Sequence, residues 1–217
     1  ISLTGQTDGR QLKAHVNGGF DRLDLFRLRL LDQDVRMAFH VNLDMESNGK
    51  DFYKLQGRMN DITLLDSSKT YRLGAINANL FTRRDTTHAA MTCGDFELRV
   101  NSRGGYAYIY NKGVRLWREL RHQLLTKHLD ESRLRQRLPL ASVYLKCGRE
   151  NIFMRVLRKY GFQVGDALVD LKSSPVAGLN GNVALHSLLA DSIQLDTIRL
   201  RVYSDNAKIA YAAQVRN

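Results

Sequence analysis

The sequence predicts a mainly β fold with an α insertion (α+β), built on a curved antiparallel sheet. Three observations lead to this prediction. Apolar and polar residues alternate in most of the chain, turn-forming pairs separate the alternating runs, and a middle stretch has apolar residues at helical spacing instead. We therefore predict a repeated antiparallel β segment over 1–111, a helical insertion over 112–161, and a continuing β segment of the same sheet over 162–217.

The clearest predicted strand is 35–43, where every second residue is apolar. Alternation of this length is typical of a strand with one buried face. Shorter runs of the same kind cover 12–16, 26–30, 96–100, 198–202 and 209–215. Between the runs we expect turns, which would make consecutive strands antiparallel neighbours, at Asp8-Gly9, Asn17-Gly18-Gly19, Asn48-Gly49, Arg103-Gly104-Gly105 and Asp205-Asn206.

The chain also repeats a local pattern. Residues 27–42 resemble residues 199–217, and three strands share a similar ending, as in His15-Val16-Asn17 and His40-Val41-Asn42. One interpretation is a hairpin unit reused along a long sheet, and the other is chance similarity among alternating sequences. Because the chain begins with Ile1 rather than Met, we expect it to be an internal part of a longer polypeptide.

The middle of the chain predicts helices. From Val114 to Leu138 apolar residues recur at helical spacing, and Trp117 falls in phase with Leu120 and Leu124, so we expect it to be a core anchor. Asp130 is the expected N-cap of a second helix that Pro139 ends. A third helix is expected over 151–160, with Asn151 as N-cap and Gly161 after its last turn.

The chain carries a net charge of +11, which suits an acidic partner or simply a solvated basic surface. The candidate residues for an anionic partner lie in the helical region: Arg115, Arg118, Arg121, Arg133, Arg135 and Arg137. No recognition-helix motif or aromatic stacking platform accompanies them, so we do not expect nucleic acid as the partner. A polyanion-binding module nevertheless remains an alternative.

Motifs of catalysis and metal binding are absent from the sequence. It contains no His-x-x-x-His pair with an intervening Glu, no Gly-x-Ser-x-Gly and no phosphate-binding Gly-x-x-x-x-Gly-Lys. We therefore expect no enzyme activity, no catalytic residue, no metal and no cofactor. The two cysteines, Cys93 and Cys147, lie in apolar surroundings and are expected to be inert buried thiols, and the spacing leaves a disulfide between them open.

The second half of the chain resembles a known family. The residues that carry the resemblance are 148–162 (GRENIFMRVLRKYGF), 169–175 (VDLKSSP), 178–181 (GLNG) and 191–198 (DSIQLDTI). These stretches are similar to the translocation and assembly module family TamB of the Bacteroidetes type, within the AsmA-like superfamily. The resemblance implies an inner-membrane-anchored protein that crosses the periplasm as a curved β-taco-like sheet with an apolar concave face.

The same resemblance implies a function. Family members take part in outer-membrane protein assembly and in phospholipid transfer along the apolar groove, without catalysis, and work with outer-membrane assembly proteins of the BamA or TamA type. Phospholipids or their acyl chains are then the expected ligands. The alternatives to this function are the polyanion module and a purely structural spacer of the cell envelope.

Within this family interpretation, certain apolar strand residues become candidates for the lining of a lipid groove. They are Val35, Met37, Phe39, Val41, Phe96, Leu98, Val100, Ile209, Tyr211 and Val215. The alternative for each residue is an ordinary closed protein core, and the helices over 114–160 are a possible cap on the groove.

Overall fold

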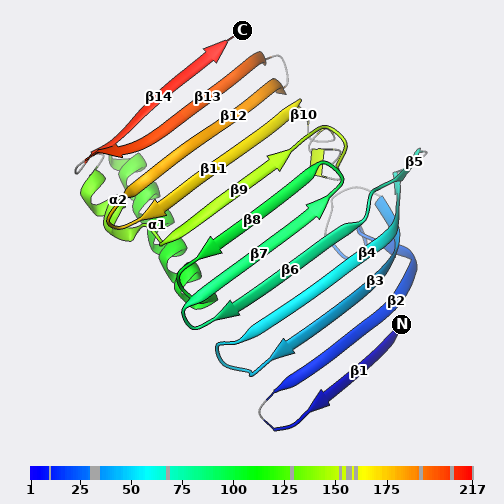
Figure 1. Cartoon of the computed structure of the whole chain (residues 1–217). Helices are drawn as coiled ribbons and strands as arrows, with labels where there is room; N and C mark the ends of the chain where they lie inside the picture. The colour runs from blue at the N-terminus through cyan, green and yellow to red at the C-terminus, as the bar shows by residue number, and fades with distance from the viewer. Residues whose placement is uncertain are drawn as a thin grey trace.

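The computed structural model shows one antiparallel sheet that carries two helices on one side (Figure 1). The structure describes residues 1–9, 11–29, 35–66, 69–127, 130–151, 153–154, 158, 161–190, 193–205 and 208–216. Within these ranges the strands are β1 (Ser2–Thr7), β2 (Leu12–Asp24), β3 (Val35–Ser47), β4 (Tyr53–Asp66), β5 (Lys69–Arg72), β6 (Ile76–Arg83), β7 (Thr86–Cys93), β8 (Phe96–Ser102), β9 (Ala141–Cys147), β10 (Phe162–Gln163), β11 (Asp166–Ser174), β12 (Gly178–Ala190), β13 (Ile193–Asp205) and β14 (Lys208–Arg216). The helices are α1 (Tyr106–Thr126) and α2 (Glu131–Arg137).

The strand order in space follows the strand order in the chain. Twelve strands form the path β1-β2-β3-β4-β6-β7-β8-β9-β11-β12-β13-β14, while the short strands β5 and β10 pair with β4 and β12. All recorded pairings are antiparallel, from β1 with β2 to β13 with β14. The predicted antiparallel β fold is therefore confirmed, as is a curved sheet that stays open, with β1 and β14 at its two edges.

Residues that lie opposite each other in neighbouring antiparallel strands point to the same face of the sheet. Following these partners from strand to strand yields three adjacent rows that cross the whole sheet. We call these rows the apolar strip, and they are Gly18-Val41-Met59-Ile76-Cys93-Phe96-Cys147-Ala167-Leu185-Ile198-Val215, Leu3-Val16-Leu43-Gly57-Ala78-Met91-Leu98-Leu145-Val169-Val183-Leu200-Ala213, and Gly5-Ala14-Met45-Leu55-Leu80-Ala89-Val100-Val143-Leu171-Gly181-Val202-Tyr211.

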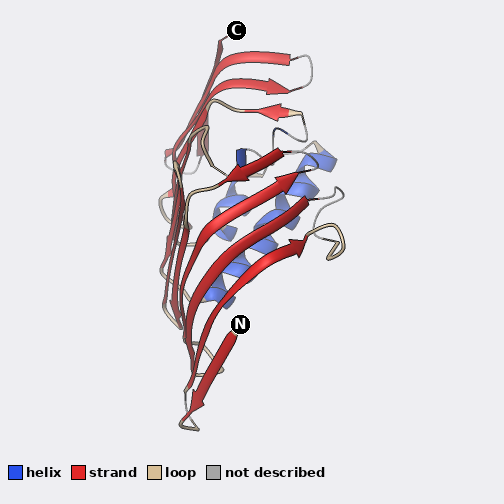
Figure 2. Ribbon diagram, turned by 90° about the vertical axis from the view of Figure 1, so that its right-hand side faces the viewer, coloured by secondary structure: helices blue, strands red, loops and turns tan. Residues whose placement is uncertain are grey.

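The sheet curls toward the side that carries the helices (Figure 2). The register shifts at two points, between Phe20 and Leu23 in β2 and between Ala38 and His40 in β3, where Asp61 of the facing strand has a φ of 52°. Such bulges bend a strand and increase its twist. They explain why β2, β3 and β4 bend at this end, where Val35 and Ile62 become fully buried.

A row of hydroxyl side chains next to the apolar strip anchors the start of α1. Thr82 Oγ1 lies 2.8 Å from Thr87 Oγ1 and accepts the Tyr106 backbone N–H at 3.0 Å, and the Tyr106 ring meets the Tyr53 ring edge-on at 5.3 Å. Thr82, Thr87 and Tyr53 are partners in register with the strip's face. The helix α1 therefore begins on the same side of the sheet as the apolar strip.

At the opposite ends of the central strands, a buried asparagine, Asn151, holds Gly148 and Met154 close to the sheet. The Asn151 side chain donates to Asp95 Oδ1 at 2.7 Å and to the Gly148 carbonyl at 2.9 Å, and accepts the Met154 N–H at 3.0 Å. Met154 then packs on Cys93, Phe96 and Cys147. The last contact is that of an N-cap, as expected for Asn151, whereas most of the predicted helix 151–160 lies outside the described residues.

Several sequence predictions about the middle of the chain were wrong. The first helix begins at Tyr106 rather than at 112. The strand β9 interrupts the predicted insertion 112–161, because residues 141–147 alternate apolar and polar side chains and pair with both β8 and β11.

The predicted orientation of the first helix was also wrong. Trp117 is 65% exposed and is no core anchor, since α1 instead buries Glu119 and Gln123. Leu120 is half-buried, and the Leu124 side chain lies outside the description. Asp130 does cap α2.

Two further predictions failed in the first segment. Residues 25–29 form a turn instead of a strand, because the Asp24 carboxylate accepts the Arg27 N–H at 2.9 Å and closes the chain on itself. Leu30 of that run lies outside the described residues, so the proposed repeat loses its first strand. The Gly18-Gly19 pair lies inside β2 rather than in a turn, where a Cβ at Gly19 would come within 2.8 Å of the His40 ring.

The two cysteines occupy the same row of the strip but are not adjacent. Phe96 lies between Cys93 and Cys147, which separates them by two strand spacings, about 9.6 Å. This distance exceeds the reach of a disulfide, and both thiols are free and buried. Burial raises the pKa of the Cys147 thiol, with Asp95 adding to the effect against a hydrogen bond from Asn151. The thiol is therefore protonated and weakly nucleophilic at neutral pH.

We expect replacement of Asn151 by Ala to destabilise the protein by about 2–3 kcal/mol, because it leaves buried hydrogen-bonding groups without partners. Cys147 should then react faster with iodoacetamide, measured by peptide mass mapping, since Met154 no longer covers it. Replacing the exposed Asn42 by Ala is the matched control and should change stability by less than about 0.5 kcal/mol. Equal denaturation midpoints and equal Cys147 labelling for both variants would show that the hydrogen bonds of Asn151 do not stabilise this part of the structure.

Candidate functional site: the apolar strip

The apolar strip is uncharged along its whole length. Its three rows contain aliphatic, aromatic, sulfur-containing and glycine residues, and its one hydroxyl group is that of Tyr211 at the edge strand β14. With strands about 4.8 Å apart and residues about 3.3 Å apart along a strand, the strip extends about 53 Å across the sheet and about 13 Å between its outer rows. The structure thus presents a long, narrow surface with no polar group to satisfy except at one edge.

Most of the strip is covered incompletely. Its buried members are Cys93, Phe96, Cys147 and Ala167, and Phe153 and Met154 pack on this group. Met91, Leu98 and Leu145 in the second row are half-buried. Toward the edges the strip opens further, and Tyr211 is 72% exposed. The helix α1 packs mainly on α2 beyond the strand ends. The helices and the segment at Asn151 therefore lie at opposite ends of the central strands, and the middle rows remain partly exposed.

The total surface area supports this description. The chain exposes 14798 Å², whereas a compact globular protein of 24.8 kDa exposes about 10,200 Å². A single curved sheet explains the difference, because the described residues form no second sheet that could pack on either of its faces. In an ordinary two-layer domain one of these faces would be a closed core.

The residues predicted to line a groove fall on one face by register, although they differ in burial. Val35, Phe39 and Phe96 are buried in protein contacts, with the Phe39 ring stacked on Phe20 at 4.9 Å and Phe96 near Phe153 at 4.4 Å. Met37, Val41, Leu98 and Val100 are half-buried, and Tyr211 and Val215 are exposed. The β14 register places Ile209 in the hydroxyl row beyond the strip, opposite Ser204, and its side chain lies outside the description.

Sequence reasoning missed the central part of the strip. Ala78, Met91, Leu145, Val169 and Val183 come from strands that were not identified individually, and they lie midway along the sheet. The signal was present in β9, where Ala141, Val143, Leu145 and Cys147 alternate with Ser142, Tyr144 and Lys146. The strand was not predicted because residues 141–147 lie between two stretches with helical spacing.

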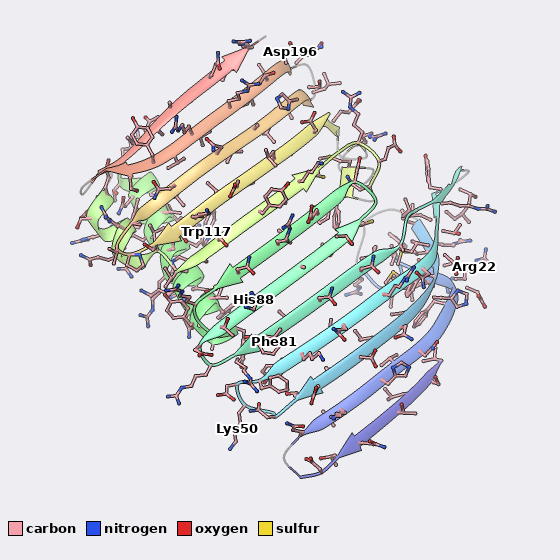
Figure 3. The ribbon with its side chains drawn as sticks, viewed as in Figure 1. Arg22, Lys50, Phe81, His88, Trp117 and Asp196 are labelled. Carbon is pink, nitrogen blue, oxygen red and sulfur yellow. The ribbon has the colours of Figure 1, made fainter. Side chains whose placement is uncertain are left out.

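The opposite face of the sheet is polar. It faces the viewer in Figure 3, where His88 is labelled and the helices lie behind the sheet. Side chains pair across strands there: His15 Nδ1 lies 2.7 Å from Asp44 Oδ1, His186 Nδ1 lies 2.6 Å from Asp166 Oδ2, and the Arg99 guanidinium lies 4.8 Å from the Tyr144 ring centre. Each of these exposed pairs contributes little to stability, and together they make this face of the sheet hydrophilic.

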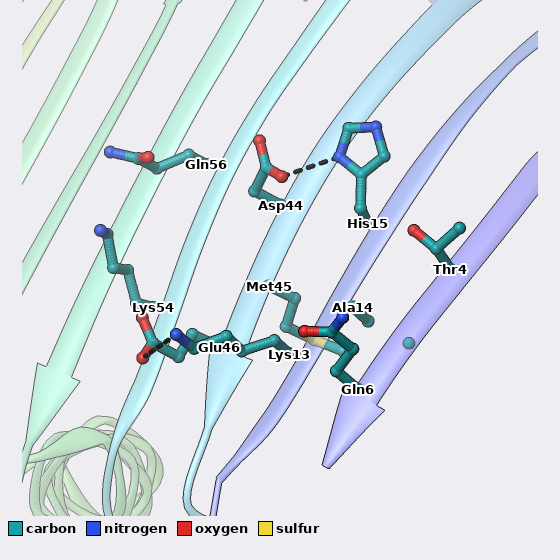
Figure 4. Close-up of a pocket in the computed structure, with 11 residues that line it drawn as sticks. Thr4, Gln6, Lys13, Ala14, His15, Asp44, Met45, Glu46, Lys54 and Gln56 are labelled. Carbon is teal, nitrogen blue, oxygen red and sulfur yellow. Dashed lines mark hydrogen bonds and ion pairs between the residues drawn. The ribbon is translucent and has the colours of Figure 1, made fainter. Parts of the chain in front are cut away.

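A depression of about 380 Å³ lies on the polar face across β1 to β4 (Figure 4). Its side chains include both signs of charge: His15 pairs with Asp44, and Lys13 Nζ lies 3.8 Å from Glu46 Oε1. Within the described residues, no group of three or more His, Cys, Asp or Glu side chains is arranged to hold a metal ion. The depression is thus a stretch of mutually paired polar surface.

The predicted anionic-partner residues separate into two sets. Arg133 pairs with Asp130 at 3.2 Å, Arg137 pairs with Glu119 at 2.9 Å, and Arg135 donates to the carbonyls of Pro175 and Val176 in the β11–β12 turn. These three arginines therefore serve internal contacts. By contrast Arg115, Arg118 and Arg121 are exposed on α1, and no ion pair is recorded for them among the described residues.

The contact between the helices centres on Glu119. Its carboxylate accepts from Gln123 Nε2 at 3.0 Å and from Arg137, and Gln123 also bonds the backbone of Asp130 in both directions. The hydrogen bond from Gln123 lowers the pKa of Glu119, and the charge of Arg137 adds to this effect against the opposing effect of burial. Glu119 is therefore held ionised, and it fixes which face of α1 turns inward.

No family model, curated protein or solved structure matches this chain. Among the described helices, none is both long and apolar enough to cross a membrane. Over the residues that the structure describes, the fold is that of an open, curved antiparallel sheet with two helices on one side.

We expect replacement of Glu119 by Gln to lower the thermal midpoint at pH 7, because the ion pair with Arg137 is lost. A carboxylate with a depressed folded pKa stabilises the protein above its unfolded pKa, and this contribution disappears as the pH falls through the folded value. The difference in midpoint between wild type and variant should therefore shrink on acidification, as followed by circular dichroism. Replacing exposed Asp170 by Asn is the control, and a gap for Glu119→Gln that stays constant with pH would contradict this role.

Proposed function

We propose that the apolar strip is the lining of a lipid groove, so that this chain is a non-catalytic, lipid-conducting segment of a cell-envelope protein. The observation that supports the proposal most directly is the partly exposed, uncharged strip across all twelve strands. Monomeric soluble proteins rarely leave apolar patches larger than a few hundred Å² uncovered, and those that do use them for binding.

The dimensions of the strip suit acyl chains. The hydrocarbon core of a bilayer is about 30 Å thick, so one leaflet's chains extend about 15 Å. A strip of about 53 Å holds several such chains along its length. Each methylene kept from water contributes about 0.8 kcal/mol without directional bonds, and a ligand held in this way is free to slide along the rows.

The curvature of the sheet supports the same function. The sheet curls toward the side on which α1 begins (Figure 2), and the Thr82 register relates that side to the strip. These two observations support a proposal in which the apolar face is the concave one and the polar face the convex one. In this proposal the fold is of the β-taco type, and water wets only its back. The Thr82 and Thr87 hydroxyls hold the start of α1 at the strand ends, beside the groove, and Glu119 and Gln123 hold α1 against α2.

The cellular setting is also part of the proposal and rests on the resemblance of residues 148–198 to the TamB family. In that setting the segment belongs to an inner-membrane-anchored protein in the periplasm and supports outer-membrane biogenesis, with phospholipid transfer and with an outer-membrane assembly protein of the BamA or TamA type as partner.

A photo-crosslinking amino acid at Leu98 is expected to capture phospholipid in cells, identified by mass spectrometry of the adduct. The same group at Arg99 should capture none, because neighbouring residues of β8 point to opposite faces of the sheet. A Leu98 probe that links only to other parts of the chain would indicate a closed core and overturn the proposal.

Replacing Leu145 by Asp is expected to reduce the phospholipid that co-purifies with the protein several-fold, because a carboxylate in the strip cannot be desolvated by acyl chains. Replacing its neighbour Tyr144 by Asp places the same charge on the polar face and should leave lipid content unchanged. Circular dichroism verifies that both variants fold. Equal lipid content in the two folded variants would contradict a role for the strip.

A further inference from the structure

The outward face of α1 combines exposed apolar side chains with arginines that make no recorded ion pair to any described residue. Tyr110, Trp117 and Leu125 are 71%, 65% and 75% exposed. They are seven and eight residues apart, so they lie on one face of the helix, opposite the buried Glu119 and Gln123. Arg118 and Arg121 lie beside them on that face.

This orientation differs from the sequence expectation. Hydrophobic spacing alone turns Trp117 toward the core and leaves only arginines outside. The structure turns the helix the other way, because Gln123 links Glu119 to the start of α2 and Arg137 pairs with Glu119. The side chains of Trp117 and Tyr110 are therefore exposed to solvent together with the basic groups of the helix.

From these observations we propose that the outward face of α1 is a docking surface for an anionic phospholipid bilayer. The helix would lie in the headgroup region, parallel to the membrane, with Trp117, Tyr110 and Leu125 inserted at the acyl boundary. Arg118 and Arg121 would lie at the phosphates. Trp and Tyr favour this depth, and helices with this division of residues bind membranes with anionic lipids.

Charge complementarity selects the partner. The helix contains four basic residues and one acidic residue, Glu119, which is already neutralised by Arg137. Each basic group near an anionic leaflet contributes about 1 kcal/mol. Leu125 favours a bilayer over nucleic acid, because an aliphatic side chain gains from hydrocarbon and has no ring on which a base can stack.

The proposal is independent of the lipid groove. If the groove exists, membrane docking by α1 brings one side of the strip close to a lipid source, yet α1 can dock whether or not the strip holds lipid. Crosslinking at Leu98 reports on the strip, and Trp117 reports on the helix, so failure of one does not imply failure of the other.

Trp117 is the single tryptophan of the chain and therefore a specific probe. The whole chain is mixed with vesicles containing phosphatidylglycerol or with phosphatidylcholine vesicles, and binding is measured by sedimentation and by Trp117 emission. We expect a blue shift of Trp117 emission and quenching by brominated acyl chains with the anionic vesicles, and a loss of both at high salt.

The double variant Arg118→Gln, Arg121→Gln should bind anionic vesicles roughly 30-fold more weakly. The matched control is Arg199→Gln, Arg201→Gln, which removes two exposed arginines from the polar face of β13 and should bind nearly as well as wild type. Equal weakening in the two double variants would show a nonspecific charge effect and overturn the proposal.

Two other outcomes also overturn it. Vesicles that sediment the protein without changing Trp117 emission would place the membrane contact on another surface. A single-stranded oligonucleotide that shifts Trp117 and binds more tightly than the anionic vesicles would make nucleic acid the partner of α1.

Discussion

Side-chain alternation on pleated strands, kept in register across twelve strands, is the constraint on which this structure depends. A slip of one residue in any pairing would turn that strand's apolar residues to the polar face. The two recorded register shifts, near Phe20 and Ala38, both lie beyond the rows of the strip. The strip is thus continuous because irregular pairing is confined to one end of the sheet, where the strands bend.

A sheet on which the described residues place no second sheet has to limit its exposed hydrophobic surface locally. Here two small devices do so from opposite strand ends. The hydrogen bonds of Asn151 bring Met154 into contact with Phe96, and the Thr82 and Thr87 hydroxyls fix the start of α1. Both are polar hydrogen-bonding groups at the margins of an apolar surface. They position these segments near the strand ends, so the same hydrogen bonds that stabilise the sheet leave its middle rows partly exposed.

Sequence alone predicted the fold class and the phase of the strands that alternate clearly. Val41, Leu98 and Val100 were assigned to one face because each strand keeps strict period two, and that pattern depends only on local geometry. The strand β9 could not be recognised as readily, since it is seven residues long and lies between helical patterns. Its place is determined by pairing with β8 and β11, which are distant in sequence, and local patterns carry no information on such contacts.

The orientation of α1 shows a second limit of sequence reasoning. Apolar spacing favours burial of Trp117, but the helix turns a carboxylate and an amide inward, because Arg137 and the backbone of Asp130 supply partners for them. These partners come from a neighbouring helix, and helical periodicity does not reveal them. The turn at residues 25–29 is similar, since the Asp24 side chain redirects a stretch that alternates like a strand.

Pairing in chain order has a consequence for how such a protein can change in length. Each main strand contacts the strand before it and the strand after it, so stability is close to a sum of nearest-neighbour terms. Insertion or loss of one hairpin, with its two alternating strands, would lengthen or shorten the apolar strip by about 10 Å and leave every other pairing unchanged. The distance that such a sheet spans is therefore an adjustable property, set by the number of hairpins and independent of any active-site geometry.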